Sequence, residues 1–200
     1  IGLICSFLLA VGFWHVNFSR IGFRAIMVPF CLVWSIYFLL KALEKNNWKF
    51  AFFSAIFFGA GFHTYIAYRI SPLIALIIFI YYFLKYRRQK NIKSFWKLVS
   101  LWIIVTFIIA LPIGLYFLHN PQDFFGRSTQ VSIFNSSNPI KELATSFIKE
   151  IGMFNVHGDC NWRHNYSCHP ELDILTGLFF LIGLILTIKN LFKKHFLFML

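Results

Sequence analysis

The 200-residue sequence is 58% hydrophobic and 20% aromatic but only 13% charged, and its mean hydropathy is +0.68. A soluble domain cannot bury so much apolar surface, so the composition excludes the soluble globular class and predicts an all-α, polytopic transmembrane helix bundle. The formal net charge of +12 would suit nucleic acid, but the placement of the basic residues indicates membrane topology instead, and we expect no nucleic-acid partner.

Apolar runs of spanning or nearly spanning length recur along the chain. About 20 residues cross the hydrocarbon core of a bilayer, and about 17 suffice. The sequence begins at Ile1 and ends inside an apolar run, so we interpret it as an internal fragment, with residues 1–200 part of a single transmembrane domain. We expect about six to seven spans, at 1–14, 25–43, 50–68, 70–86, 95–118 and 172–188, with another beginning at 195.

If these runs cross alternately, their connections fall on two sides of very different charge. The side with a net charge of 12 − 1 = +11 comprises 41–49, 85–97 and 189–194. The side with a net charge of 7 − 6 = +1 comprises 15–24, residue 69 and 119–173. Positively charged loops face the cytoplasm. We therefore expect a multi-pass protein of the plasma or inner membrane whose 119–173 loop is extracytoplasmic.

The 119–173 connection is too long for an idle linker. Between Ile140 and Ile151 its apolar residues recur along one face at helical spacing. This pattern predicts a short amphipathic helix within the loop, lying at the outer membrane interface.

Basic and aromatic residues gather at the predicted outer ends of the spans. Arg20 and Arg24 are four residues apart, which would place both on one helix face, suited to gripping phosphate. In the segment 59–69, Tyr65 and Arg69 have the same spacing and follow His63. Snorkelling arginines and an aromatic belt are the structural alternative for both segments.

Two further features lie in the outer loop. Arg127 is a weaker candidate for contacting an anion, since an ordinary loop arginine explains it equally well. The stretch Met153–Asp173 is dense in His, Cys and acidic residues, and Arg163, His164 and Asn165 form its tightest polar triplet.

The cysteines of this stretch have two interpretations. Cys160 and Cys168, with three histidines nearby, raise the possibility of zinc, but their spacing matches no standard zinc template. A disulfide at the outer face is the favoured interpretation, with free thiols as the alternative. We expect no metal site and no cofactor.

Three motifs, in order, resemble GT-C membrane glycosyltransferases of the dolichyl-phosphate-mannose-protein mannosyltransferase type. They are SRIGFRA at 19–25, the G-x-G-x-x-T-Y-x-x-Y-R pattern from Gly59 to Arg69, and GMFNVHGDCNWRHNYSCHPELDILTG beginning at Gly152. Cys160 and Cys168 depart from the family, in which Pro- or Gly-like loop residues are expected.

The resemblance implies an enzyme that moves a mannosyl-like sugar from a polyprenyl-phosphate donor to an acceptor, which is a protein, a glycan or a glycolipid. It implies a catalytic Asp or Glu in an earlier outer loop, upstream of this fragment. The donor pocket would include Arg20, Arg24, Tyr65 and Arg69, closed by Arg163, His164 and Asn165. A transporter or flippase of lipid-linked anions is the alternative, and it would favour polar groups at mid-membrane.

Overall fold

The computed structural model describes residues 2–130 and 138–190, with the side chains of 127–130 outside the description. Every regular element in these ranges is helical. The chain forms two compact units: one comprises Ile1–Phe23 with Ser132–Leu200, and the other comprises Arg24–Val131.

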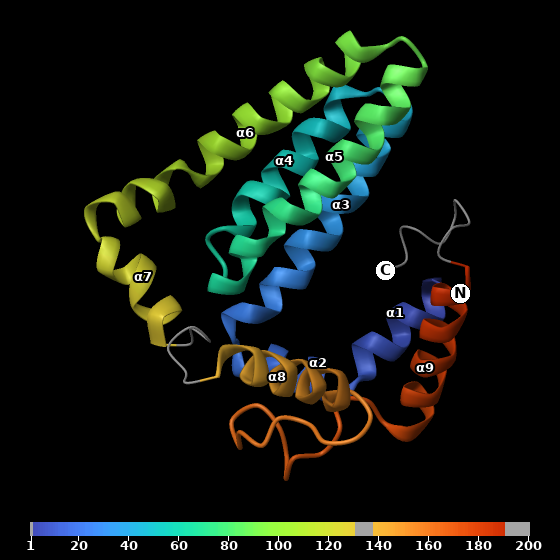
Figure 1. Ribbon diagram of the computed structural model, residues 1–200, viewed down its shortest axis with the longest axis vertical. Coiled ribbons are helices and arrows are strands. Elements are labelled where there is room, and N and C mark those ends of the chain that lie inside the picture. Colours follow the sequence, from blue (N-terminus) through green and yellow to red (C-terminus); the bar gives the residue numbers. More distant parts are fainter. Residues whose placement is uncertain (1, 131–137, 191–200) are drawn as a thin grey trace. The chain divides into compact units, whose positions relative to one another are not determined.

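The Arg24–Val131 unit is a bundle of long helices (Figure 1). After the short 3-10 helix η1 (Arg24–Ile26), it contains α3 (Met27–Lys45), α4 (Trp48–Gly61), α5 (Ser71–Arg88), α6 (Ile92–His119) and α7 (Pro121–Gln130), with the 3-10 helix η2 (Ile66–Ile70) leading into α5. Small residues such as Ala42, Ala51 and Ala55 are almost fully buried. They let α3 and α4 pack closely, as small residues do between membrane helices.

A buried polar group cross-links three helices of this bundle. Ser54 Oγ donates to the Ser35 carbonyl at 2.8 Å, and Trp102 Nε1 donates to Ser54 Oγ at 2.9 Å. These residues come from α3, α4 and α6 and are at most 5% exposed. Hydrogen bonds satisfy their polar atoms where water is excluded, so they fix the register of the three helices.

The two basic turns of the bundle lie at the same end. The α3–α4 turn is held to the α5–α6 turn by Ser94 Oγ, which donates to Asn46 Oδ1 at 2.6 Å, and by Tyr86 Oη, which donates to the Leu43 carbonyl at 2.6 Å. Asn46 adopts the left-handed conformation that ends α3, and the Asn47 side chain caps α4. The cationic residues of 41–49 and 85–97 therefore share one end of this unit, opposite the end where α4 finishes and α5 begins (Figure 1).

The other unit combines segments from both parts of the sequence. It contains α1 (Gly2–Val11), α2 (Phe13–Ile21), α8 (Pro139–Met153) and α9 (Ile174–Lys189), with an irregular loop between α8 and α9. The amphipathic pattern at 140–151 falls within α8, whose Ile140, Phe147 and Ile148 are exposed. Asp173 begins α9 by accepting from the Thr176 N–H at 3.0 Å.

Three helical segments are long and apolar enough to cross a membrane: Arg24–Lys45, Ile66–Arg88 and Ile92–His119. The pair α1 and α2, bent by 58°, would make a fourth if it forms one span. The apolar helices α4 and α9 have 14 and 16 residues. At 1.5 Å per residue they reach about 21–24 Å, short of the roughly 30 Å hydrocarbon core. The described chain is thus a helical, membrane-type protein with fewer full-length spans than hydropathy alone suggests.

Two expectations about shared helix faces are wrong. Arg20 and Arg24 do not lie on one helix, because α2 ends at Ile21 and Gly22 adopts a left-handed φ of 66°. Tyr65 is extended, with φ −142° and ψ 153°, and only caps the 3-10 helix that contains Arg69. In both cases a turn interrupts what sequence spacing treated as one helix.

Candidate functional site

An open cleft of about 530 Å³ lies in the Arg24–Val131 unit, at the end opposite the basic turns. It forms where α4 finishes, η2 and α5 begin, and α6 gives way to α7. Four residues singled out by the sequence line it together: Arg24, His63, Tyr65 and Arg69. The remaining lining is largely apolar and aromatic, and includes Phe62, Tyr68, Ile113, Phe117 and Phe124.

Arg69 lies against aromatic rings in this cleft. Its guanidinium carbon is 3.9 Å from the centre of the Phe124 ring and 5.0 Å from that of Phe117. Nη1 donates to the Phe124 carbonyl at 2.8 Å, one of five N–H donors that a guanidinium carries. Among the described side chains, no carboxylate lies within ion-pair distance of Arg69. A partly desolvated cation without a counter-ion favours an anionic ligand.

His63 contributes a ring with a defined tautomer. Its Nε2 lies 2.9 Å from the Ile109 carbonyl of α6. Since a carbonyl can only accept, Nε2 carries the proton, and Nδ1 is then the acceptor nitrogen of the neutral ring. Pro112 interrupts the same part of α6, where it removes a backbone donor. His63 therefore ties the end of α4 to α6 and brings an imidazole into the cleft wall.

Two glycines shape the cleft floor. A Cβ on Gly61 would lie 1.9 Å from Cζ of Tyr68, a residue only 1% exposed. A Cβ on Gly59 would lie 2.8 Å from Cβ of Ile109. Gly61 thus provides the space for the Tyr68 ring, and Gly59 allows α4 to approach α6. The G-x-G spacing is a packing requirement directly beneath the candidate site.

Asp123 is a cleft residue that the sequence reasoning missed. It lies in the first turn of α7, and its Oδ2 accepts from Tyr116 Oη at 2.6 Å. Among the described residues that line the cleft, it supplies the carboxylate. The turn signal Asn120-Pro121 just before it was the available clue, because it starts a helix that folds Asp123 back beside the end of α6.

The other predicted site residues lie elsewhere. Arg127 is in α7, in the same unit as the cleft, but its side chain is outside the described part. Arg20 lies in the last turn of α2, and Arg163, His164 and Asn165 belong to the α8–α9 loop; all four are in the other unit. The cleft therefore brings together Arg24, His63, Tyr65 and Arg69 but not the complete predicted set.

His164 anchors the α8–α9 loop within its unit. Its ring centre is 5.3 Å from those of both Phe18 and Phe23, and Asn17 Nδ2 donates to its carbonyl at 2.7 Å. Nδ1 lies 2.9 Å from Asp159 Oδ2. These contacts give His164 a role in holding the loop to the α2 segment.

The loop also contains a buried carboxyl. Glu171 is 8% exposed, and its Oε1 accepts from the Asp159 N–H at 3.3 Å. Desolvation, with a smaller contribution from the Asp159 charge, raises the pKa of Glu171 to about 7. Desolvation also acts on Asp159, but hydrogen bonds from the Asn161 N–H and His164 outweigh it and lower its pKa. Two carboxyls in one loop thus have opposite pKa shifts.

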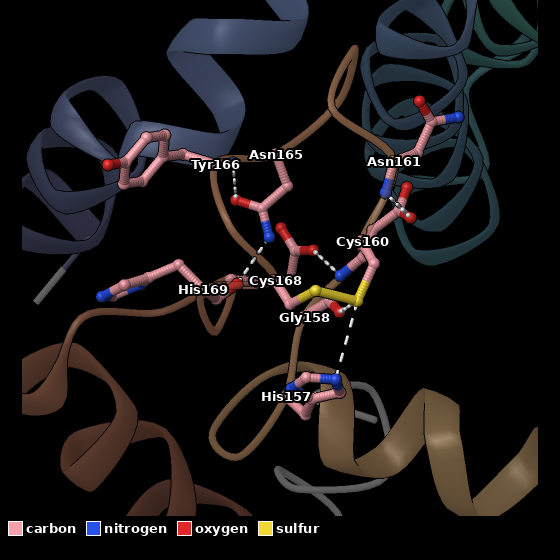
Figure 2. The surroundings of a disulfide bond; sticks show 10 residues. His157, Gly158, Cys160, Asn161, Asn165, Tyr166, Cys168 and His169 are labelled. Carbon is pink, nitrogen blue, oxygen red and sulfur yellow. Dashed lines mark hydrogen bonds between the residues drawn. A yellow bond between two sulfur atoms is a disulfide. The ribbon is translucent and has the colours of Figure 1, made fainter.

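Asn165 and the disulfide complete the loop (Figure 2). Asn165 is 4% exposed, and its amide bonds to the His169 carbonyl and the Tyr166 N–H. Cys160 and Cys168 are joined by a disulfide, and Gly158 N donates to the Cys168 carbonyl at 3.1 Å. Arg163 is the exposed member of the predicted triplet, with its guanidinium 5.7 Å from the Trp162 ring centre.

Most of the sequence that forms the cleft matches a known protein family. Residues 1–116 match the family model described as dolichyl-phosphate-mannose-protein mannosyltransferase, which is more than half of the 200 residues. The chain belongs to this family. No curated protein and no solved structure matches the chain significantly.

Membership of the mannosyltransferase family makes a membrane glycosyltransferase the general function. The matched region contains the motifs at 19–25 and Gly59–Arg69, and with them the four predicted site residues that line the cleft. The stretch beginning at Gly152 lies beyond the match, so its resemblance to the family's last outer loop remains a prediction.

Proposed function

We propose that the protein transfers a sugar from a polyprenyl-phosphate-linked donor to an acceptor at the extracytoplasmic membrane face, and that the cleft holds the donor. The observation that carries this proposal is Arg69: a cation held against Phe117 and Phe124, without a carboxylate partner among the described side chains. Family membership supports the reaction class.

The cleft suits both parts of such a donor. Arg24 and Arg69 would neutralise the phosphate and stabilise the negative charge that grows on it as the sugar leaves. The aromatic lining gives flat apolar surfaces for a sugar ring, and His63 adds a hydrogen-bonding group.

Charge distribution supports the extracytoplasmic placement. The turns rich in Lys and Arg share one end of the Arg24–Val131 unit, and the cleft lies at the other. Basic turns face the cytoplasm. In this arrangement the chain would be a multi-pass protein of the cell membrane, and α8 would rest its apolar face on the outer interface.

The test measures transfer and donor binding separately. Arg69→Ala should lower both transfer from a polyprenyl-phosphate sugar and binding of the polyprenyl phosphate. Lys93→Ala, at the basic end, is the matched control and should change neither. Full activity of Arg69→Ala would refute the proposed phosphate site.

A second arm separates the enzyme from a transporter of lipid-linked anions, which no observation here favours. Reconstituted protein is given labelled donor and an acceptor mixture. Label in the acceptor supports transfer, whereas movement of intact donor across the bilayer without sugar release would support the transporter.

A further inference from the structure

A cluster of soft metal ligands lies in the α8–α9 loop, in the other unit from the cleft. His157 Nε2, Cys160 Sγ and Cys168 Sγ all lie within 4.8 Å of one another. Figure 2 shows the His157 ring directed at the disulfide, with Nε2 3.6 Å from Cys160 Sγ. His157 and Cys160 are exposed, and Cys168 is half-buried. The cluster is therefore preassembled and accessible.

We propose that His157, Cys160 and Cys168 form a redox-controlled site for a soft divalent cation such as Zn²⁺: closed by the disulfide when oxidised, and metal-binding when reduced. This proposal is independent of the glycosyl-transfer proposal.

The positions of the ligand atoms fit a tetrahedral ion. With Zn–S of about 2.3 Å and Zn–N of about 2.0–2.1 Å, a tetrahedral S···N edge is about 3.6 Å and an S···S edge about 3.8 Å. The observed separation of Cys160 Sγ and His157 Nε2 is 3.6 Å. Cys168 Sγ lies within 4.8 Å of His157 Nε2, and the two sulfur atoms must move apart, which becomes possible once their bond is reduced. Three protein ligands with a water in the fourth position make a known open type of zinc site.

The surrounding loop supports the ligands without competing for the metal. Asp159, next to Cys160, accepts from the Asn161 N–H at 2.9 Å and lies 2.9 Å from His164 Nδ1, so its carboxylate is already bonded within the loop. Gly158 N donates to the Cys168 carbonyl, which holds the two halves of the cluster together independently of the sulfur atoms. A Cβ on Gly158 would lie 2.0 Å from the His169 carbonyl, so this close approach requires glycine.

The chemistry balances with a dithiol as reductant. Its two thiols give two electrons and two protons to the Cys160–Cys168 bond; two cysteine thiols form and the reductant becomes a disulfide. Zn²⁺ then binds the two thiolates and the neutral His157 ring, and releases the two thiol protons to solvent. A disulfide oxidant reverses the sequence: it takes up the two electrons, and two protons from solvent, to become a dithiol, the Cys160–Cys168 bond re-forms, and Zn²⁺ is released.

The experiment uses the full chain in detergent, reduced with a phosphine, which takes up oxygen from water as the two thiols form. Zn²⁺ binding is measured by titration and metal analysis before and after reduction. We expect one Zn²⁺ per reduced chain and none per oxidised chain. X-ray absorption should show two sulfur neighbours at about 2.3 Å and nitrogen or oxygen neighbours at about 2.0–2.1 Å.

Variants assign the ligands. Cys160→Ser/Cys168→Ser retains Cys5 and Cys31 and should bind no Zn²⁺, which also measures any contribution of those two thiols. His157→Ala should weaken binding at least tenfold, whereas His169→Ala, an exposed histidine of the same loop, should leave it unchanged. Reduced wild type that binds no more Zn²⁺ than the double variant, or His157→Ala that binds as tightly as wild type, would overturn the proposal.

A protease-protection assay covers the case in which reduction loosens the loop. Zn²⁺ should restore resistance of the 154–173 segment in reduced wild type but not in the double serine variant. Failure of Zn²⁺ to protect the reduced wild type counts against the site.

Discussion

Arg69 holds α7 through Phe124: the guanidinium lies 3.9 Å from the centre of that ring and donates to the carbonyl of the same residue at 2.8 Å. This arginine of η2, just before α5, thus has two roles in the proposed site: it holds the cleft wall and it binds phosphate. It fixes the cleft wall opposite it and presents the remaining donors of its guanidinium to a phosphate.

Replacing Arg69 by Lys separates these two purposes. Lysine keeps the charge but loses the planar stacking on Phe124 and the forked donor geometry. We expect an affinity loss for polyprenyl phosphate of about tenfold for Arg69→Lys and about 30- to 100-fold for Arg69→Ala. Equilibrium binding to detergent-solubilised protein checks this. Equal affinity of the lysine variant and wild type would show that the charge alone matters.

Gly61→Ala should damage the cleft floor. The added Cβ would lie 1.9 Å from Cζ of the buried Tyr68 ring, which must then move into the cleft or out of its packing. Overpacking of this kind costs about 1–3 kcal/mol, so we expect a lower melting temperature together with weaker donor binding. Gly183→Ala is the matched control, since this helical glycine lies in α9 of the other unit and a Cβ there meets nothing within 4 Å. Similar losses in both variants would contradict the steric explanation.

Asp123→Asn should strengthen binding of the anionic carrier. The amide oxygen of Asn can still accept from Tyr116 Oη, while a negative charge is removed from the cleft. For an exposed charge, the gain should be about 0.5–1 kcal/mol, or roughly two- to fivefold in affinity. The gain should shrink as salt is raised. An unchanged affinity at low salt would place the bound phosphate away from α7.

Glu171 should make the stability of the α8–α9 loop depend on pH. Its pKa is about 7 in the folded loop and 4.5 in the unfolded chain, so the folded state binds more protons between these values. Stability therefore falls as pH rises from about 4.5 to 7, by at most about 3 kcal/mol. Asp159 and His164 are the ionisable neighbours that act on this carboxyl.

Amide hydrogen exchange in the loop of the oxidised protein, followed from pH 5 to 8 and corrected for intrinsic rates, measures this dependence. Glu171→Gln keeps the shape and removes the ionisation, so its loop should show a much weaker dependence over this range. If the loop of Glu171→Gln shows the same pH dependence of exchange as the wild type, then another ionisable group causes that dependence.

The sequence predicted the helical membrane class because hydropathy depends only on composition within each run. It could not predict the turns that interrupt those runs. Gly22 ends α2 between Arg20 and Arg24, and the bonds from His63 N–H to the Ala60 carbonyl and from Thr64 N–H to the Gly61 carbonyl end α4 before Tyr65. Both breaks are local backbone events inside segments whose hydropathy and spacing suggest continuity.

The candidate site, too, could be predicted from the sequence only in part. Arg24, His63, Tyr65 and Arg69 were predicted because a basic and aromatic motif stands out in an apolar chain, and the cleft brings them together. Asp123 was missed because its placement depends on how α7 folds back from α6. The structural roles of His164 and Asn165 were also invisible in sequence, since they depend on contacts with Phe18, Phe23 and the His169 carbonyl.

The hydrogen bond from Asn17 Nδ2 to the His164 carbonyl joins residues 147 positions apart. During synthesis, α2 leaves the ribosome long before its partner loop exists, and all of Arg24–Val131 emerges in between. The N-terminal helices therefore exist before their partner loop does, and Phe18 and Phe23 are not yet in contact with His164. The Arg24–Val131 bundle can already assemble during this time. Final assembly of the terminal unit can therefore begin only after residue 164 has been made, and chains stopped before that residue should contain a folded Arg24–Val131 bundle and an unfinished second unit.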